Sequence, residues 1–492
     1  MKYHLVILLG ILLLLGSAES AFAIHAEIPS ETQAVIATGG TQITIGGQVR
    51  VRAEVQQNTR DFNSNIPDHQ AYTDQRVRLS VEAKITPNTI GMIQLESTNE
   101  NTSSIAPDLN IWGNYGSNPN VSTSYATGLY VAGNAKHSPL SVLQAWIQYS
   151  GTGLFGVPAG VKVGHMPLIL GNGIFLDHSK FGDDAILFFT DPVQDFHVIA
   201  WTAKFREGNT VQNDDANAYV LVLNYAPKTW SAAFDATFID DQRSFGTAAT
   251  VPGAFNAAAP SFPPGPFYTN GPGPNSPTHF WNFGLHLNAN IDGFALKGDG
   301  ELQAGKIDNA SPNGKADFTG WAAMLGGSYK LDPVTLSLEW AYGSGPSATT
   351  QNVPAFITSL GNDQRFTYVY EYRTVNACGQ QSGGICNTQY LKLGGAAELA
   401  KDLNSYLSLY WLHANKVSAL VFPTGGQSSK DIGWEVDAKL NYKIDRNLNW
   451  WVEGGYLFAG NFWETVQAVQ KQPLGSSVDN AYAARTGIQL DF

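Results

Sequence analysis

Residues 76–85 read RVRLSVEAKI, and this stretch decides the fold class. Apolar and polar side chains alternate along it, so that Val77 and Leu79 follow Arg76 and Arg78 one for one. Successive side chains of a β-strand point to opposite faces of the sheet. A strict period of two therefore predicts a strand with one apolar face and one charged face.

The same alternation recurs along the chain from residue 41 to the last residue. Further examples are residues 48–55, 296–304, 432–442 and 482–492. A soluble β-sandwich also alternates, but its apolar faces share a core between two sheets, and a single-chain sandwich of this size would be unusual. Repeated strands with several charges on one face favour lipid outside and water inside. We predict an all-β fold, a transmembrane antiparallel up-and-down β-barrel.

The composition agrees with a barrel that has a wet interior. Charged residues make up 14% of the 492 residues, whereas soluble domains average about 25%. Long apolar runs do not take their place, because the chain is instead rich in Gly, Asn, Thr, Ser and aromatic residues. The net charge of −12 and the lack of a basic tract exclude nucleic acid as a partner.

Residues 1–23 have the form of a secretory signal peptide. Lys2 supplies the positive end, residues 5–15 form the apolar core, and Ala21-Phe22-Ala23 gives the small-x-small pattern of a cleavage site. The alternative is an uncleaved anchor, but the apolar run is short for a span of about 20 residues. We expect cleavage after residue 23.

After the signal peptide, we expect a periplasmic N-terminal segment over 24–40 and the transmembrane β-barrel over 41–492. Tight turns with Pro, Asp or Asn lie at 86–88, 226–228, 290–292, 331–333, 401–403 and 445–447. Long loops rich in Gly, Pro, Ser and Asn lie near 99–139, 240–278, 343–388, 414–430 and 459–478. Outer-membrane barrels have short periplasmic turns and long external loops, so we place both termini in the periplasm.

This arrangement requires an even number of strands, and we expect about 18, with 16 as the alternative. The alternation is weakest between residues 160 and 200. The expected strands are 43–57, 74–85, 89–98, 141–150, 159–165, 182–190, 195–206, 216–225, 229–239, 279–289, 294–305, 317–330, 334–343, 389–400, 404–413, 431–444, 448–458 and 480–492.

Aromatic residues gather near the ends of the expected strands, as at Tyr225, Trp230, Tyr329 and Trp340. Such rings suit the membrane–water interface, and the alternative is ordinary strand packing. The expected partners of the barrel are therefore outer-membrane lipid and lipopolysaccharide. The terminal Phe492 resembles the recognition signal of outer-membrane barrels, which implies that the barrel-assembly machinery binds the last strand.

Three segments carry a family resemblance. They are Gln144-Ala145-Trp146-Ile147-Gln148-Tyr149, Val161-Lys162-Val163-Gly164-His165 and Leu170-Gly171-Asn172-Gly173. They resemble a strand, a Gly-plus-basic pair and a Gly-rich loop of the Gram-negative outer-membrane porin superfamily, in particular of its alginate-export-like 18-strand porins. His165 stands where Arg is more usual in that family. The resemblance implies passive transport and leaves the solute open.

Five arginines should share one wall of the lumen. Closure of the barrel brings the last strand beside the first, so Arg485 joins Arg50, Arg52, Arg76 and Arg78 on the polar faces of three neighbouring strands. Fixed charges that line a pore discriminate ions by sign. The alternative is that each arginine only pairs with a carboxylate of the wall, such as Glu54, Glu82 or Asp491.

The resemblance to porins implies that the third external loop, residues 166–182, folds inward and narrows the pore. The candidate constriction residues in and after this loop are Asp177, His178, Lys180, Asp183 and Asp184. An acidic loop that faces a basic wall would create a transverse field in the pore. The alternative is an external loop with ordinary polar chemistry.

Cys378 and Cys386 are the two cysteines of an exported chain, so we expect a disulfide between them in the seventh external loop. No nucleophile elbow and no His-Glu-x-x-His motif occurs, so we predict no catalytic residues and no enzyme. No cofactor motif and no metal site is predicted either. His178, His197 and His286 are interpreted as wall or loop residues.

These features predict an outer-membrane porin, a water-filled passive channel for small hydrophilic solutes, with anionic solutes as a candidate class. The alternatives are a dedicated exporter of an anionic polymer and a barrel sleeve for an electron-transfer partner. A wide, clear lumen is needed for the sleeve, and an inward loop counts against it. A homotrimer is a candidate assembly. An outer-membrane enzyme would require a convergent catalytic set, for which the sequence gives little support.

Overall fold

The structure is a computed structural model of the chain. It describes residues 34–38, 40–59, 62–65, 68–97, 112, 140–153, 156–207, 215–242, 277–310, 314–346, 352–359, 366–378, 383–417, 429–464 and 478–492. The expected signal peptide and parts of the long loops lie outside the described residues.

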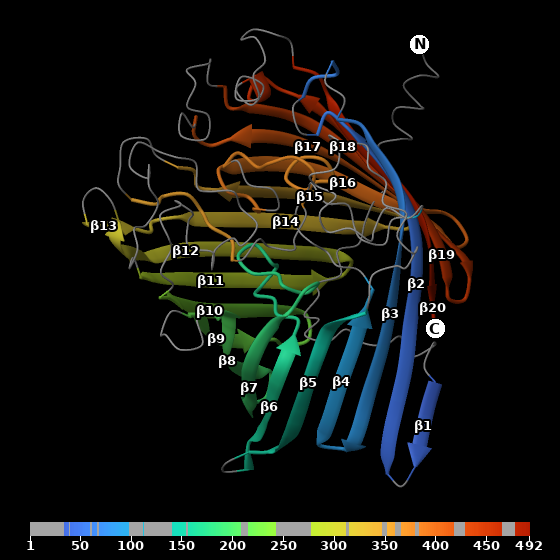
Figure 1. The fold of residues 1–492 in the computed structure, drawn as a ribbon, viewed down its shortest axis with the longest axis vertical. Coiled ribbons are helices and arrows are strands. Elements are labelled where there is room, and N and C mark those ends of the chain that lie inside the picture. Colours follow the sequence, from blue (N-terminus) through green and yellow to red (C-terminus); the bar gives the residue numbers. More distant parts are fainter. Residues whose placement is uncertain are drawn as a thin grey trace, which may run out of the picture.

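The chain forms a closed antiparallel barrel of 18 strands, in which each strand pairs with the next along the chain. Closure occurs where β2 (Thr41–Gln57) pairs with β20 (Ala481–Asp491) on one side and with β3 (Gln70–Thr86) on the other. Figure 1 shows the strands following one another around the wall in chain order. The fold class and the strand number predicted from the sequence are thereby confirmed, and the alternative of 16 strands is wrong.

The remaining barrel strands lie close to the predicted spans. They are β4 (Thr89–Glu96), β5 (Ser141–Thr152), β6 (Pro158–Met166), β7 (Asp183–Val193), β8 (Phe196–Arg206), β9 (Ala216–Tyr225), β10 (Trp230–Asp241), β11 (Thr278–Ile291), β12 (Phe294–Ala310), β14 (Trp321–Leu331), β15 (Val334–Gly343), β16 (Thr388–Ala400), β17 (Leu403–Ala414), β18 (Asp431–Asp445) and β19 (Leu448–Ala459).

Two short strands extend the barrel beyond the predicted set. β13 (Gly314–Asp317) pairs with the end of β12. β1 (Ala34–Thr38) falls in the segment expected to be an N-terminal extension, and it pairs with residues 41–45 of β2. Because β20 pairs with residues 48–57 of β2 in the same direction, β1 continues the line of β20 beyond the C-terminus, as Figure 1 shows.

The C-terminal residue is part of this junction. The backbone N–H of Phe492 donates to the carbonyl of Gly47 at 2.8 Å, and Gly47 donates in return to the carbonyl of Phe492. A Cβ atom at residue 47 would lie 2.5 Å from the Phe492 ring. A side chain at residue 47 would therefore displace the terminal aromatic ring.

The alternation of side chains separates the two faces of the wall, as β11 illustrates. Trp281, Leu285 and Leu287 are exposed, whereas the intervening Asn282 and His286 are buried. Exposed aliphatic and aromatic residues on one face suit contact with lipid, which transfers apolar surface out of water. The buried polar residues on the other face belong to the barrel interior. Among the described residues, no helix is both long and apolar enough to cross a membrane.

Short turns gather at one end of the barrel and long loops at the other. We call these ends the turn end and the loop end. Two connections at the loop end matter for the interior: L3, residues 167–182 between β6 and β7, and L7, residues 344–387 between β15 and β16. The described parts of both loops pack inside the barrel.

Candidate functional site

L3 folds into the barrel interior and packs on the wall formed by β11. Its apolar residues Leu170, Ile174, Phe175 and Leu176 are almost completely buried. The ring of Phe175 stacks on that of Phe280 from β11, with centroids 5.9 Å apart. Because β8, β9 and β10 separate β7 from β11 around the barrel, this contact shows that L3 extends into the lumen and narrows it.

The base of L3 is held by His178, which is fully buried. Its Nε2 donates to the carbonyl of Ser359 in L7 at 3.0 Å, and its Nδ1 lies 2.7 Å from the Asp183 carboxylate. The backbone N–H of Ser359 also donates to the carbonyl of Phe175 at 2.9 Å. L3 and L7 are therefore joined to each other inside the barrel.

L7 is fixed to the same wall by an amide pair. The Gln303 side chain of β12 accepts from the backbone N–H of Ile357 at 3.0 Å and donates to the Ile357 carbonyl at 2.6 Å. Two reciprocal bonds to one backbone unit position the loop as a strand ladder would. Residues 352–359 of L7 thus lie along β12 and β14.

Another part of L7, residues 366–373, docks on the wall formed by β18. The carboxylate of Glu435 in β18 accepts from the backbone N–H groups of Tyr368, Val369 and Tyr370 at 2.9, 2.6 and 2.8 Å. The two oxygens of one carboxyl group can accept several N–H bonds at once. This single side chain therefore holds three consecutive residues of the loop.

Arg373 completes the docking of L7. Its guanidinium donates to Oε1 of Glu54 in β2 at 2.7 and 3.0 Å and to the carbonyl of Tyr368 at 2.6 Å. Burial alone would lower the pKa of Arg373, but the Glu54 carboxylate together with Tyr368 and Tyr372 outweighs burial and raises the pKa. The side chain stays charged, and it lies over the rings of Tyr368 and Tyr372.

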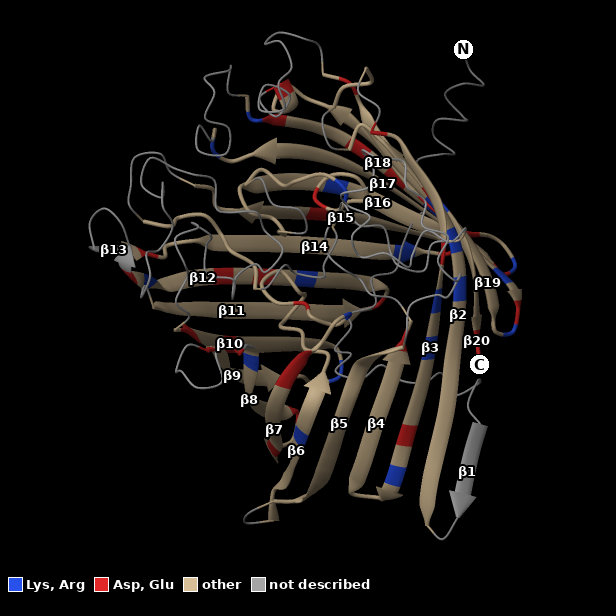
Figure 2. Cartoon of the chain, viewed as in Figure 1, with Lys and Arg blue, Asp and Glu red and all other residues tan. Residues whose placement is uncertain are grey.

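The five arginines of the predicted wall lie on neighbouring strands and face the interior. Figure 2 shows the basic residues of β2 and β3 side by side. Arg50 and Arg52 both lie within ion-pair distance of Asp74, at 3.8 and 2.7 Å. Arg76 and Arg78 both pair with Glu96, the former at 3.8 Å.

Arg485 occupies the same wall on β20. It pairs with Glu453, which also lies 3.2 Å from Lys439. Its Nη1 donates to the hydroxyl of Tyr372 in L7 at 3.2 Å. The carboxylate partners differ from those named from the sequence, because neighbouring strands are offset and bring Asp74, Glu96 and Glu453 opposite the arginines.

The structure does not bring all five candidate constriction residues together. His178 and Asp183 form the buried pair at the base of L3, and Asp177 caps the N–H and hydroxyl of Ser179. Lys180 is exposed. Asp184 follows Asp183 along β7 and so points to the other face, where it is exposed and lies 2.9 Å from His165.

The remaining predicted pair, Cys378 and Cys386, is joined in a disulfide with Cα atoms 5.8 Å apart. Both residues are buried within L7. The disulfide lies between the docked segment 366–373 and the start of β16. It shortens the stretch of L7 that lies unanchored between residue 373 and β16.

Several residues of the lumen were not predicted. Glu435 was placed on the polar face, but nothing in the sequence pairs it with amides 65 residues earlier. Lys162 is buried with its Nζ 3.8 Å from the Trp146 ring centroid. Lys162 lies at a polar position of the period-two pattern, which could have placed it inside the barrel. Its contact with Trp146 depends on the register between β5 and β6.

Comparison with known proteins places this architecture. The sequence matches the alginate export family over residues 41–475. The chain belongs to the alginate export family. No curated protein matches the sequence.

Solved structures similar to this alginate export family member are Gram-negative outer-membrane porins. OccK9 (OpdG) of Pseudomonas aeruginosa has a TM-score of 0.51 at 10% identity, covering 92% of this chain and 98% of that one. OccK5 (OpdH) of the same organism has a TM-score of 0.49 at 11% identity, covering 91% and 98%. OpdK with vanillate, also from Pseudomonas aeruginosa, has a TM-score of 0.48 at 11% identity over the same shares.

At such identities the likeness supports the fold alone. Together with the family match, it shows that this alginate export family member is an outer-membrane channel protein. The sites that decide its selectivity must be argued from its own residues.

Proposed function

We propose that the protein is a passive channel for small hydrophilic solutes and that it favours anions that carry carboxylate groups. The observation that carries this proposal is the pairing of four arginines on β2 and β3 with two carboxylates, Asp74 on β3 and Glu96 on β4. Among the described residues, Arg50 and Arg52 share Asp74, while Arg76 and Arg78 share Glu96. This part of the wall therefore holds two guanidiniums for each of these carboxylates.

The four guanidiniums are placed where a solute can meet them. The four arginine side chains retain between 12% and 23% of their exposure, whereas Asp74 retains none. Guanidinium groups bind carboxylates through paired N–H donors. L3 and L7 narrow the lumen, and in a narrow pore with low-dielectric walls the field of fixed charges is stronger than in bulk water.

The family match favours a second candidate, export of an anionic polymer. The arginine wall would serve either solute. The inward loops support the small solute over the polymer, because L3 and L7 are bonded to each other and to both sides of the barrel. We also propose that the turn end and both termini face the periplasm, as the alternation of short turns and long loops indicates.

The test removes two positive charges and keeps both carboxylates paired. Arg50 and Arg76 are the more distant partners of Asp74 and Glu96, so Arg50→Gln with Arg76→Gln leaves one arginine on each carboxylate. We expect the reversal potential in a salt gradient to move toward cation preference and the flux of a small carboxylate to fall. A matched control neutralises two lysines near the turns, Lys228→Gln with Lys330→Gln. An unchanged reversal potential in the double arginine variant would overturn the proposal.

Solute size separates the two candidates. Liposomes that contain the purified protein are tested for swelling in galacturonate and for release of entrapped uronate oligomers. Swelling in the monomer without release of oligomers supports the small-solute channel. Release of oligomers at a comparable rate supports the polymer exporter.

A further inference from the structure

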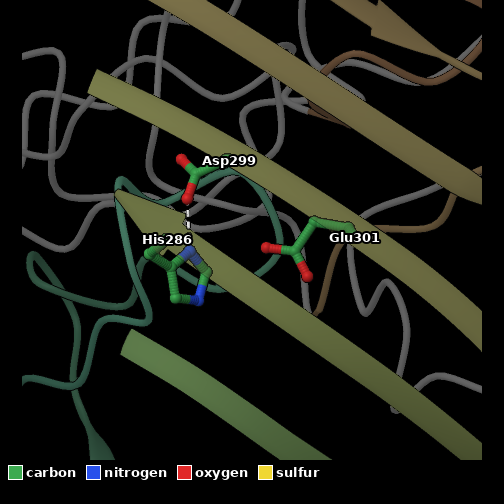
Figure 3. Close-up of side chains that lie close together, drawn as sticks. All are labelled: His286, Asp299 and Glu301. Atoms are coloured by element: carbon green, nitrogen blue, oxygen red, sulfur yellow. Dashed lines mark hydrogen bonds and ion pairs between the residues drawn. The ribbon is translucent and has the colours of Figure 1, made fainter. Parts of the chain in front are cut away.

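Four ionisable side chains meet under L3, on a wall that the arginines do not reach. Asp235 comes from β10, His286 from β11, and Asp299 and Glu301 from β12. All four are buried, with exposures of 6% or less. Figure 3 shows His286, Asp299 and Glu301 pointing toward one another from the two neighbouring strands.

The cluster holds more negative charge than its partners neutralise. Among the described residues, His286 is the one basic group within ion-pair distance of Asp235 and Asp299, and Glu301 accepts from the Asn282 amide at 2.7 Å. Oδ2 of Asp299 and Oε1 of Glu301 are buried without a hydrogen-bond partner. A buried carboxylate oxygen without a partner is costly, and such groups are normally paired or bound to a metal.

The geometry suits a cation at this position. One ligand atom each of His286, Asp299 and Glu301 lies within 4.8 Å of the other two. On the other side of the ring, Nε2 of His286 lies 2.5 Å from Oδ2 of Asp235. A carboxylate that accepts from the second ring nitrogen is the usual support of a metal-binding histidine, because it fixes the tautomer and the orientation of the ring.

We propose that His286, Asp299 and Glu301 bind a divalent transition-metal ion through Nδ1 and two carboxylates, with Asp235 as the residue that positions His286. The imidazole ligand favours a transition metal over Ca²⁺ and Mg²⁺, which prefer oxygen ligands throughout. Zn²⁺ is bound by such sets of His and carboxylate ligands. This differs from the interpretation of His286 as a plain wall residue.

A second proton on His286 offers a simpler arrangement, in which the imidazolium bridges Asp235 and Asp299. That arrangement gives Oε1 of Glu301 no partner and leaves three carboxylates around one positive charge. A divalent ion would satisfy the carboxylates of Asp299 and Glu301 at once. The two arrangements differ in whether Glu301 matters for Zn²⁺ binding.

The site lies directly beneath the crossing loop. Gly171 of L3 has φ +53°, and a Cβ atom there would lie 1.9 Å from Nδ1 of His286. A Cβ at Gly284 would lie 2.1 Å from Oδ2 of Asp235. Both glycines give the cluster its room, and the ion would neutralise the wall at the point where L3 rests on it. This inference does not depend on the solute of the channel.

The experiment uses the full mature chain without a histidine tag, purified in detergent and dialysed against EDTA. Zn²⁺ is titrated in competition with a chromophoric chelator, and bound metal is counted by mass spectrometry. We expect one Zn²⁺ for each chain, unaffected by a tenfold excess of Ca²⁺. Glu301→Gln should weaken binding at least tenfold, and Asp235→Asn should weaken it about 10- to 100-fold.

The matched control is His197→Asn, because His197 lies 2.6 Å from Asp191 in an exposed pair near a turn. It should bind Zn²⁺ like the unchanged protein. The shift in gel migration between heated and unheated samples shows that each variant has folded. Absence of stoichiometric Zn²⁺, or unchanged affinity in folded Glu301→Gln, would overturn the proposal and leave the imidazolium arrangement.

Discussion

Removal of Glu435 should release L7 from the far wall of the barrel. In Glu435→Ala, the backbone N–H groups of Val369 and Tyr370 lose their acceptor. Tyr368 keeps one, because its N–H also lies 3.1 Å from Asp437. The strands remain unchanged, so the barrel itself should fold.

The size of the effect follows from the two bonds that are lost. A buried donor left without its acceptor costs about 1–3 kcal/mol, and two would amount to about 2–6 kcal/mol. Water in the lumen can replace part of this, so we expect about 3 kcal/mol. Each 1.4 kcal/mol is a factor of ten, and the population of undocked L7 should rise roughly 100-fold.

Trypsin provides the assay, because Arg373 lies within the docked segment and its side chain is only 4% exposed. We expect the folded unchanged protein to resist cleavage after Arg373 and the Glu435→Ala protein to be cut there. Single-channel conductance should rise in parallel as L7 leaves the lumen. Glu398→Ala removes an exposed carboxylate from β16 and serves as the control. Equal resistance to trypsin and equal conductance in Glu435→Ala would refute this account of L7.

Three further predictions concern the loops. Thiol titration of the denatured, unreduced protein should find no free thiol at Cys378 or Cys386, and reduction should destabilise L7 by about 2–3 kcal/mol; two free thiols would contradict the disulfide. A membrane-impermeant maleimide on intact cells should label Asn65→Cys and not Arg446→Cys, whereas labelling of both would rule out the proposed orientation. Gly171→Val should push L3 off β11 and raise conductance, because its backbone conformation and the His286 ring exclude a side chain; an unchanged conductance would contradict that contact.

The strands could be predicted from the sequence because each one carries its own period-two signal. The stretch 76–85 lies within β3, and β9 and β15 have the predicted bounds. β1 and β13 were missed because they are too short to show a period. They pair with the adjacent ends of β2 and β12, beyond the part of each strand that carries the alternation.

The site was less accessible from the sequence. The five arginines could be placed on one wall because they lie on the polar faces of their strands and because closure brings the last strand beside the first. Their partners required the offset between strands, which sets Arg52 beside Asp74. The docking of Glu435 and Arg373 joins residues that are far apart in the chain, and no local pattern predicts such contacts. Asp184 was wrongly assigned to the constriction. Because adjacent residues of a strand point to opposite faces, Asp183 and Asp184 cannot both face the lumen.

The contact between Arg373 and Glu54 joins residues that are 319 positions apart, and it also bears on the order of folding. L7 reaches β18 on one side and β2 on the other, and these strands lie on opposite sides of the closing junction formed by β2 and β20. Before closure the two anchors are on separate ends of an open sheet. The loop can therefore engage both of them only in a finished barrel. An incompletely assembled molecule would carry L7 loose and open to proteases, so the narrowed pore is a property that the chain acquires as its last step.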